Sequence, residues 1–226
     1  MTHTKQSIVA TGINKYFHDP VTFQVLKNIN FEVDKGEFVA ITGKSGSGKS
    51  TLMYLLSTMD NGYEGNIAIN GQQVTGLNQK QLADFRNEHI GFVFQFHYLL
   101  PEFTVLDNLM LPALKLNKKP KEYIEQRALE LVDLLDVKGQ EKKLASRLSG
   151  GQQQRIAIAR AMMNEPAIIM GDEPTGNLDS KNASVVIETF RHLAKEFGQT
   201  IIAVTHDNDF AARCDRIIAL ADGEII

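Results

Sequence analysis

Residues 38–51 read FVAITGKSGSGKST, an apolar run followed by a glycine-rich loop. The first part, Phe38–Ile41, is a short apolar run, which is typical of a buried β-strand. The following loop matches the pattern G-x-x-x-x-G-K-[ST] and leads into a helical pattern over residues 50–57. Strand, loop and helix in this order are the context of a phosphate-binding P-loop. A glycine-rich turn with an incidental lysine does not explain that order.

The residue types of the loop suit a phosphate. The glycines allow the backbone to curl so that its N–H groups face inward, and the helix N-terminus adds a positive end. Lys49 is predicted to reach the β- and γ-phosphates, and the Ser50 hydroxyl to bind Mg²⁺. The predicted phosphate-binding residues are Gly43, Lys44, Ser45, Gly46, Ser47, Gly48, Lys49, Ser50 and Thr51.

Residues 167–173, AIIMGDE, form an apolar run that ends in two carboxylates. In a P-loop protein, Asp172 would hold Mg²⁺ directly or through water. Glu173 would then lie where an attacking water must be activated. Paired acids at a strand end often only face solvent, but the P-loop upstream favours the metal interpretation.

A second glycine-rich stretch, LSGGQ at residues 148–152, lacks the lysine and the preceding strand of a P-loop. A helical pattern follows it, with apolar residues at Ile156, Ile158, Ala159 and Met162. Ser149 and the two glycines therefore lie at a helix N-terminus, where amides are available to an anion. Taken alone, the stretch is only a helix-capping signal.

Composition is ordinary for a globular protein of 226 residues, with 43% hydrophobic and 23% charged residues. The net charge of −3 gives no basic field that would point to nucleic acid. The single cysteine, Cys214, excludes a disulfide framework, fits a reducing compartment, and has no neighbour that would make it reactive. No secretory signal and no apolar run of about 20 residues is found, so we expect a soluble chain that reaches a membrane only through a partner.

Strand patterns alternate with helical ones, which predicts an α/β fold with a mostly parallel sheet. A helical region intervenes, and we expect it to form an insertion near residues 97–160. Within it, residues 125–135 place Ala128, Leu129, Leu131, Val132 and Leu135 mostly on one helix face. The further strands are expected at residues 67–69, 91–94, 167–170, 201–204 and 217–220.

Five elements occur in the order found in the ATP-binding cassette (ABC) ATPases, which the chain resembles over essentially its whole length. They are GKSGSGKS, Gln95 after a strand, LSGGQ, IIMGDE and His206 in VTHD, and Tyr16 in NKYF resembles that family's adenine-stacking aromatic residue. The resemblance implies a P-loop NTPase core with a mostly parallel sheet, an antiparallel β subdomain and an inserted α-helical subdomain. It also implies one nucleotide-binding domain over residues 1–226.

The resemblance gives each of these residues a role toward ATP and Mg²⁺. Gln95 would contact Mg²⁺ and the attacking water, Glu173 would polarise that water, and His206 would contact the γ-phosphate. Tyr16 would stack on adenine, with a strand-edge aromatic as the other interpretation and Phe17 as a weaker candidate for the same contact.

In the resembled family, the LSGGQ signature caps the γ-phosphate of the ATP on the other subunit of a head-to-tail dimer. Ser149, Gly150, Gly151 and Gln152 would therefore belong to the partner's site, and the protein would be a homodimer with ATP at the interface. Leu178 and Asp179 in GNLDS resemble the D-loop that crosses this interface. The commoner form is S-A-L-D, so Gly176 and Asn177 depart from the pattern.

Among ABC ATPases, one compact cassette without heptad repeats fits the transporter class better than chromosome-structural or two-cassette translation proteins. Residues 91–112, GFVFQFHYLLPEFTVLDNLMLP, resemble the lipoprotein-release and macrolide-export ATPases. A cell-division relative with a mechanotransmission or sensing role remains the alternative. The resemblance implies integral membrane partner subunits, no nucleic acid, and a cytoplasmic position on the inner face of the membrane. Phe96–Phe103 would either bind that partner or only pack the helical lobe.

Overall fold

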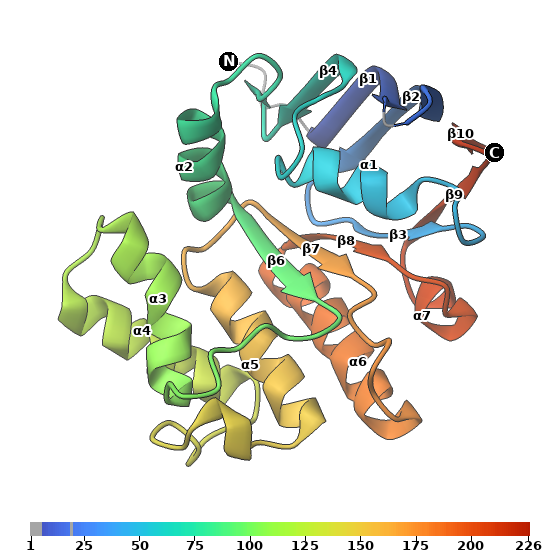
Figure 1. Cartoon of the computed structure of the whole chain (residues 1–226). Helices are drawn as coiled ribbons and strands as arrows, with labels where there is room; N and C mark the ends of the chain where they lie inside the picture. The colour runs from blue at the N-terminus through green and yellow to red at the C-terminus, as the bar shows by residue number, and fades with distance from the viewer. Residues whose placement is uncertain (1–5, 19) are drawn as a thin grey trace.

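Two β-sheets organise the chain, as the computed structural model shows for residues 6–18 and 20–226 (Figure 1). The smaller sheet has the strand order β2-β1-β4-β5, and all of its pairs are antiparallel. Its strands are β1 (Gln6–Phe17), β2 (Phe23–Asp34), β4 (Glu64–Ile69) and β5 (Gln72–Gln73). The antiparallel β subdomain expected from the resemblance is therefore present.

The larger sheet has the order β10-β9-β3-β8-β7-β6 and is parallel except for the terminal pair β10–β9. Its strands are β3 (Phe38–Thr42), β6 (Ile90–Phe94), β7 (Ile168–Asp172), β8 (Thr200–Val204), β9 (Arg216–Ala221) and β10 (Glu224–Ile225). The predicted mostly parallel sheet is confirmed, and every predicted strand belongs to one of the two sheets. Carboxyl ends of parallel strands meet at one edge, so the segments after β3, β6, β7 and β8 converge there.

The helices cover the larger sheet on both faces (Figure 1). In that view α1 lies between the two sheets, and α5 and α6 lie on the opposite face of the larger one. The helices are α1 (Lys49–Leu56), α2 (Gln79–His89), α3 (Val105–Leu116), α4 (Lys121–Leu134), α5 (Gly150–Met162), α6 (Ser180–Phe197) and α7 (Asn208–Ala212), with a short 3₁₀ turn at Ala145–Arg147.

The core is divided by the larger sheet because side chains alternate between the faces of a strand. In β3, Phe38 packs with the helices that include α5 and α6, whereas Val39 and Ile41 pack with α1 and the smaller sheet. The strands of the larger sheet are thus apolar on both faces, which explains why the sequence shows them as short continuous apolar runs rather than alternating ones.

The structure corrects one position of the predicted helix at residues 125–135. Ala128, Leu131 and Val132 are buried in α4, but Leu129 is 39% exposed. Leu129 follows Ala128 by one position and so lies about 100° around the helix from it, at the edge of the buried face. Within the described part of the chain, no helix is both long and apolar enough to cross a membrane.

Candidate nucleotide-binding site

The loop between β3 and α1 has a backbone that side chains would not tolerate at two glycines. Gly43 has φ 145° and Gly48 has φ 101°, both outside the range that L-residues normally adopt. A Cβ atom on Gly43 would lie 2.2 Å from the Leu220 carbonyl oxygen, and one on Gly48 would lie 2.7 Å from Leu26 Cδ2. The glycines therefore allow both the curvature of the loop and its close packing against other segments of the same chain.

The loop offers several groups to an anion. Gly48 caps α1 without a side-chain hydrogen bond, so no side chain covers the first-turn N–H groups. Lys49 Nζ donates to the carbonyl oxygens of Gly43 (2.8 Å) and Lys44 (2.9 Å) of its own loop. In the described residues, the buried Ser47 hydroxyl has no hydrogen-bond partner. A helix N-terminus, an ammonium group and an orphaned hydroxyl in one loop fit a polyphosphate.

The acidic pair at the end of β7 faces this loop. Glu173 has φ 48°, and its amide donates to the Val204 carbonyl oxygen (3.0 Å). Its carboxylate Oε1 lies 2.8 Å from His206 Nδ1, and the His206 amide donates to Oε2 (3.4 Å). A left-handed glutamate is uncommon, and such backbone strain is concentrated at functional sites. The two residues predicted to act on water and on the γ-phosphate are therefore hydrogen-bonded to each other.

Asp172 lies at the last position of β7 in an environment that disfavours its charge. Burial raises the pKa of this carboxyl group above its ordinary value, and the neighbouring Glu173 carboxylate raises it further. The Tyr54 hydroxyl donates to Asp172 Oδ2 (3.4 Å). A cation bound at Asp172 would oppose both effects, because a nearby positive charge favours the ionised carboxylate.

A cavity of about 550 Å³ opens over the loop and joins these groups. Much of the P-loop lines it together with Glu173 and His206. The lining residues are Phe17, Phe23, Val25, Gly43, Ser45, Gly46, Gly48, Lys49, Ser50, Thr51, Glu173 and His206. Of the predicted residues, Tyr16, Lys44, Ser47, Gln95, Asp172 and Ser149–Gln152 are not part of this lining.

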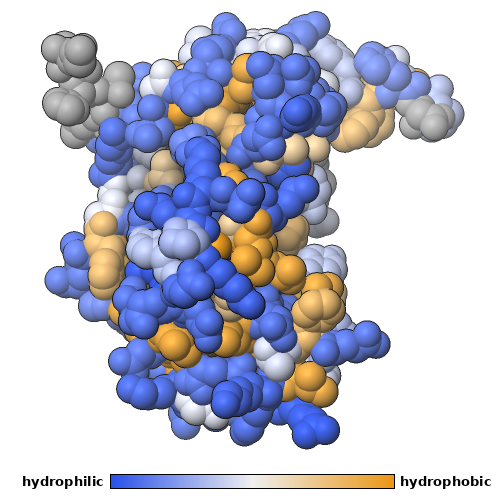
Figure 2. Space-filling model, turned by 90° about the vertical axis from the view of Figure 1, so that its left-hand side faces the viewer, coloured by the Kyte–Doolittle hydropathy of each residue, from blue (hydrophilic) through white to orange (hydrophobic). Residues whose placement is uncertain are grey.

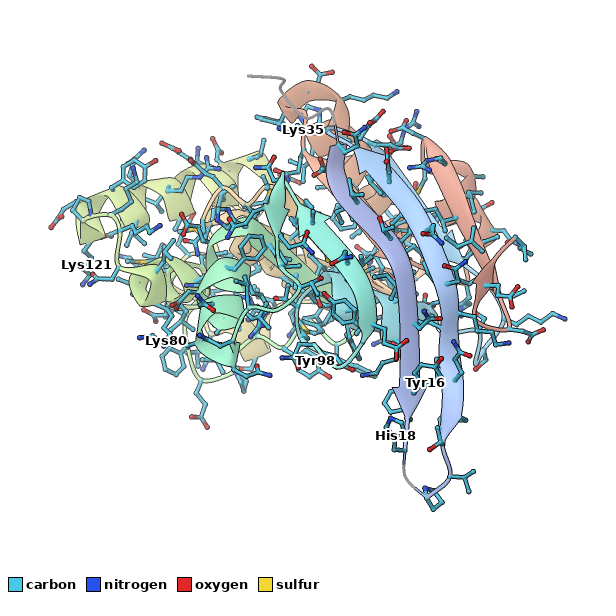
Figure 3. The ribbon with its side chains drawn as sticks, turned by 90° about the horizontal axis from the view of Figure 1, so that it is seen from above. Tyr16, His18, Lys35, Lys80, Tyr98 and Lys121 are labelled. Carbon is cyan, nitrogen blue, oxygen red and sulfur yellow. The ribbon has the colours of Figure 1, made fainter. Side chains whose placement is uncertain are left out.

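The aromatic side of the cavity is formed by Phe17 and Phe23, which face each other in the β1–β2 register with ring centroids 5.7 Å apart. Tyr16 precedes Phe17 and stacks instead with His18, at a centroid distance of 6.4 Å. Figure 3 shows Tyr16 and His18 near the tip of the long β1–β2 hairpin. The sequence analysis did not predict Phe23. The signal that could have identified it is the pair of aromatic residues, Phe17 and Phe23, on the two strands of one hairpin.

The signature turn packs against α6 and not against the P-loop of its own chain. Ser149 and Gln152 cap α5 reciprocally, since Ser149 Oγ accepts from the Gln152 amide (3.4 Å) and Gln152 Oε1 accepts from the Ser149 amide (3.1 Å). A Cβ atom on Gly151 would lie 2.2 Å from Asn182 Oδ1 at the start of α6. The helix-capping interpretation is therefore correct as local structure, and the residues of this turn do not line the cavity.

Gln95 follows β6 at the same sheet edge but is engaged by the segment after β7. Its Nε2 donates to Asn177 Oδ1 (3.3 Å), and Asn177 Nδ2 donates to the Gln95 carbonyl oxygen (3.1 Å). A further contact that the sequence did not predict is that of the buried Gln154 in α5, whose Nε2 donates to the Pro174 carbonyl oxygen. The signature helix thus supports the chain just after Glu173.

The segment after Gln95 is anchored by Arg160 of α5. Its guanidinium donates to the carbonyl oxygens of His97 and Tyr98, at 2.7 Å each. Those two residues both have positive φ, of 56° and 47°. The anchored segment exposes large hydrophobic side chains, namely Phe96 (63%), Tyr98 (61%), Leu100 (42%) and Phe103 (45%). Leu99 alone packs against the core, so the exposed side chains are free to meet a partner.

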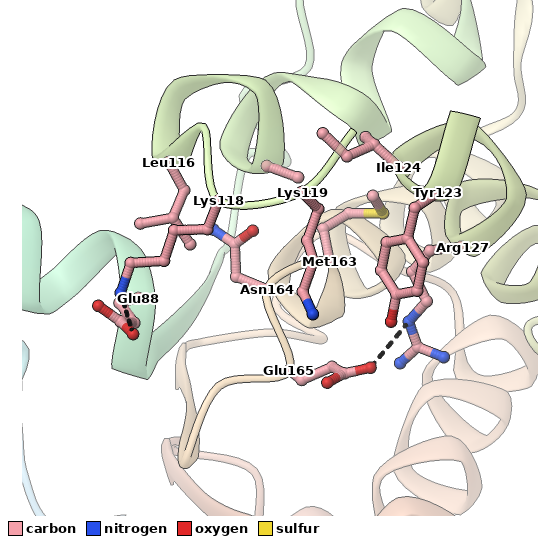
Figure 4. A pocket seen from close by; sticks show the side chains of 11 residues that line it. Glu88, Leu116, Lys118, Lys119, Tyr123, Ile124, Arg127, Met163, Asn164 and Glu165 are labelled. Atoms are coloured by element: carbon pink, nitrogen blue, oxygen red, sulfur yellow. Dashed lines mark hydrogen bonds and ion pairs between the residues drawn. The ribbon is translucent and has the colours of Figure 1, made fainter. Parts of the chain in front are cut away.

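A second cavity is lined by none of the predicted site residues. This cavity, between the ends of α2, α3 and α5 and the start of α4, is bordered by the ion pairs Lys118–Glu88 and Arg127–Glu165 (Figure 4). The side of the molecule that carries α2 and α3 shows separate hydrophobic patches among hydrophilic side chains (Figure 2). Burial, with a smaller effect of Asp215, raises the pKa of the Cys214 thiol to about 12, which fits the prediction that this cysteine is unreactive.

A parallel sheet with a glycine-lined phosphate loop after β3, and an acidic pair after β7, defines a P-loop nucleotide-binding protein. Comparison with known proteins narrows this class. Residues 26–176 match the family model described as ABC transporter. The lipoprotein-releasing system ATP-binding protein LolD 1 of Chlorobium chlorochromatii is 46% identical over 201 residues, which cover 89% of this chain and 82% of that protein.

Two further comparisons agree. The macrolide export ATP-binding/permease protein MacB of Mannheimia succiniciproducens is 48% identical over 215 residues, covering 95% of this chain but 33% of that protein. A dimeric structure of a post-hydrolysis state of the cassette MJ0796, bound to ADP and Pi, superposes with a TM-score of 0.87 at 37% identity, covering 96% of each chain. The chain belongs to the ABC transporter family, and it is an ATP-binding cassette with ATPase activity. These relatives favour the transporter interpretation over the cell-division alternative.

Proposed function

We propose that the chain hydrolyses ATP as one half of a head-to-tail pair and passes the resulting movement to a membrane protein. The observation that carries the proposal is the cavity over the P-loop, which joins Lys49 and Ser50 to the hydrogen-bonded Glu173 and His206. The signature residues do not line this cavity. The phosphate-binding residues and the signature of one chain thus lie in different places. The ATP site is therefore incomplete in a single chain, and a two-fold pair of chains would complete it.

The residues around the cavity divide the work of hydrolysis. Lys49, which now bonds to its own loop, would turn to the β- and γ-phosphates of bound ATP. Glu173 would accept a proton from the attacking water, and His206, oriented by Glu173, would donate a hydrogen bond to the γ-phosphate as charge develops there. Phe17 and Phe23 would supply the apolar face for adenine, with Tyr16 as the candidate that the motif resemblance favours.

Ser50, Asp172 and Gln95 are the residues that would hold Mg²⁺. A lone carboxylate and a hydroxyl suit this ion, which is usually bound by one or two carboxylates together with substrate phosphates and waters. Among residues 6–18 and 20–226, no group of three His, Cys, Asp or Glu side chains could hold a metal without such help. Bound at this position, Mg²⁺ would neutralise charge on the β- and γ-phosphates.

The partner is proposed to be an integral membrane subunit of the lipoprotein-release or macrolide-export type. The names of the LolD and MacB relatives support this, as do the exposed side chains of Phe96–Phe103. The cassette would then be cytoplasmic and peripheral on the inner face of the membrane. We take residues 1–226 as one nucleotide-binding domain, in which residues of about 97–160 form the helical subdomain.

The shared-site arrangement is tested by mixing two damaged chains. Lys49→Ala removes the charge at the phosphates, and Ser149→Arg places bulk where the partner's γ-phosphate would dock. If each site uses the P-loop of one chain and the signature of the other, a mixed dimer contains one intact site. ATP-dependent dimerisation, together with hydrolysis, should therefore recover on mixing differently tagged chains.

The matched control places both changes in one chain and mixes it with wild type. In the shared-site arrangement, this mixed dimer has no intact site, because each site receives one damaged half. If the signature served its own P-loop, the results of the two mixtures would be reversed. Recovery only in the control mixture would therefore overturn the proposal.

A further inference from the structure

The turn that follows Glu173 holds Gln95 from two sides. Asn177 uses both atoms of its side-chain amide, since Nδ2 donates to the Gln95 carbonyl oxygen and Oδ1 accepts from Gln95 Nε2. Gly176 provides the space for this arrangement, because a Cβ atom there would lie 2.8 Å from Gln95 Nε2. The two residues that make the sequence read G-N-L-D are thus the two that contact Gln95.

The Gln95 side chain bonds to Asn177 and is not part of the ATP cavity lining. In the β6–β7 register Phe94 lies opposite Asp172, so Gln95 begins one residue beyond the level of the proposed metal carboxylate. Its side chain nevertheless bonds to Asn177 and does not line the cavity over the P-loop. Gln95 is therefore near the position where it would act, but its amide is engaged elsewhere.

The turn is also in contact with the signature residues of the same chain. Asp179 caps α6 by accepting from the Asn182 amide (2.8 Å), and the Asn182 side chain occupies the space beside Gly151. Leu178 Cδ2 lies 4.0 Å from where a Gly150 Cβ atom would be. A displacement of the signature turn would therefore be passed through these contacts to the turn that carries Asn177.

We propose that Asn177 is a positioning residue that holds the Gln95 amide outside the ATP cavity until the 176–179 turn moves. The inference rests on the proposed role of Gln95 toward Mg²⁺ and on the signature meeting ATP of the partner. Closure of the pair would shift the turn, break the Asn177 contact and allow Gln95 to turn toward the metal. The Gln95 side chain would then have two positions, one bonded to Asn177 and one turned toward the metal, and a ligand shifts their populations only by its differential affinity for them. Removing the Asn177 contact should therefore favour the position toward the metal.

The experiment uses Asn177→Ala, which removes both hydrogen bonds, in a Glu173→Gln background that prevents turnover. The quantity measured is the Mg²⁺ concentration that half-saturates binding of a fluorescent ATP analogue. A hydrogen bond of ordinary net strength changes an equilibrium by about 2- to 10-fold, so we expect the half-saturating Mg²⁺ concentration to fall by about that factor. Affinity for the analogue in EDTA should not change.

Two further variants separate positioning from a merely structural effect. Gly176→Ala places a methyl group against the Gln95 amide and should lower the Mg²⁺ requirement in the same direction. Asn66→Ala is the matched control, because it removes another Asn–Gln contact between exposed side chains (Gln73 Nε2 to Asn66 Oδ1, 3.0 Å), neither of which lines the cavity. It should leave the Mg²⁺ requirement unchanged.

A nucleotide-free measurement gives an independent readout. The side-chain amide resonances of Gln95, assigned by comparison with Gln95→Ala, should shift in Asn177→Ala and not in Asn66→Ala. In a Gln95→Ala background, Asn177→Ala should no longer alter the Mg²⁺ requirement.

The outcomes distinguish the positioning role of Asn177 from the proposed role of Gln95 toward Mg²⁺, on which it depends. Gln95→Ala alone should raise the Mg²⁺ requirement, and if it does not, the proposed role of Gln95 fails and the positioning role fails with it. If Gln95→Ala acts as expected but Asn177→Ala leaves the requirement unchanged, only the positioning role is overturned. An effect of Asn177→Ala that persists without Gln95 would overturn it equally.

Discussion

Replacing Glu173 by glutamine tests the chemistry of the site with little disturbance of its structure. The glutamine amide has the shape of the carboxylate, and its Oε1 can still accept a hydrogen bond from His206 Nδ1, which now lies 2.8 Å from the carboxylate. The backbone is unchanged, because the left-handed conformation (φ 48°) is no harder for Gln than for Glu. The change therefore removes the ability to accept a proton, together with the long hydrogen bond from the His206 amide to Oε2 (3.4 Å), because a glutamine Nε2 cannot accept one.

The expected loss of turnover follows from the loss of the proton acceptor. General-base assistance contributes about 10²–10⁴-fold, which corresponds to about 3–5 kcal/mol of activation free energy. Affinity for Mg-ATP should be retained, since Lys49, Ser50 and Asp172 are untouched. Because bound ATP then persists, the closed pair should accumulate and be visible as a doubling of mass in light scattering with Mg-ATP.

Steady-state phosphate release and fluorescent-nucleotide binding measure the two halves of this prediction. Glu188→Gln on α6 is the control, because it also neutralises a glutamate but one that pairs with Arg213 on the surface. Its turnover should match wild type. If Glu173→Gln hydrolysed ATP at the wild-type rate, Glu173 would not be the base, and the reasoning from its position would fail.

Three other expectations concern adenine, the membrane partner and pH. Phe17→Ala should weaken ATP binding more than Tyr16→Ala does, because Phe17 lines the cavity, and equilibrium titration would contradict this if the order were reversed. Tyr98→Glu or Leu100→Glu should keep basal ATPase activity and lose membrane association, so normal assembly of either variant would place the docking surface elsewhere. Burial raises the pKa of Asp172, so between its ordinary and its raised pKa the folded state binds more protons, and stability falls as pH rises. The Asp172→Asn variant should therefore have a higher melting temperature than wild type in EDTA near pH 7. Each kcal/mol gained in the free energy of unfolding would raise the melting temperature by about 2–4 °C. An unchanged or lower melting temperature would refute this reasoning.

Features encoded in a few consecutive residues were predictable from the sequence. The strand expected at residues 38–41, which leads into the P-loop, is β3. The strand expected at residues 67–69 ends at the Asn-Gly pair Asn70 and Gly71, whose φ values are 49° and 81°. Helix capping at Ser149 was likewise read from neighbouring residues. In each case the physical cause, a steric preference or a local hydrogen bond, operates over only a few positions.

Contacts between distant segments were not predictable in this way. Gln95 and Asn177 are 82 residues apart, and the sequence alone gives no reason to pair an exposed amide with a particular turn. The choice between Tyr16 and Phe17 depended on which side of β1 faces the P-loop. Register shifts along the β1–β2 pair, including one between Lys15 and Tyr16, break the simple alternation from which that side would be deduced.

Helix α5 connects two surfaces that serve different neighbours. Its first turn is the signature at Ser149, and its last turn holds the carbonyl oxygens of His97 and Tyr98 through Arg160. Eleven residues of α-helix span about 16 Å at 1.5 Å per residue, and a helix packed along its length moves as a rigid rod. A tilt imposed at the nucleotide end must therefore appear at the aromatic segment on the outer surface, with no intervening loop to absorb it. Helix α5 thus links the signature turn to the exposed aromatic segment over a fixed distance, and Arg160 is the residue that attaches that segment to the helix.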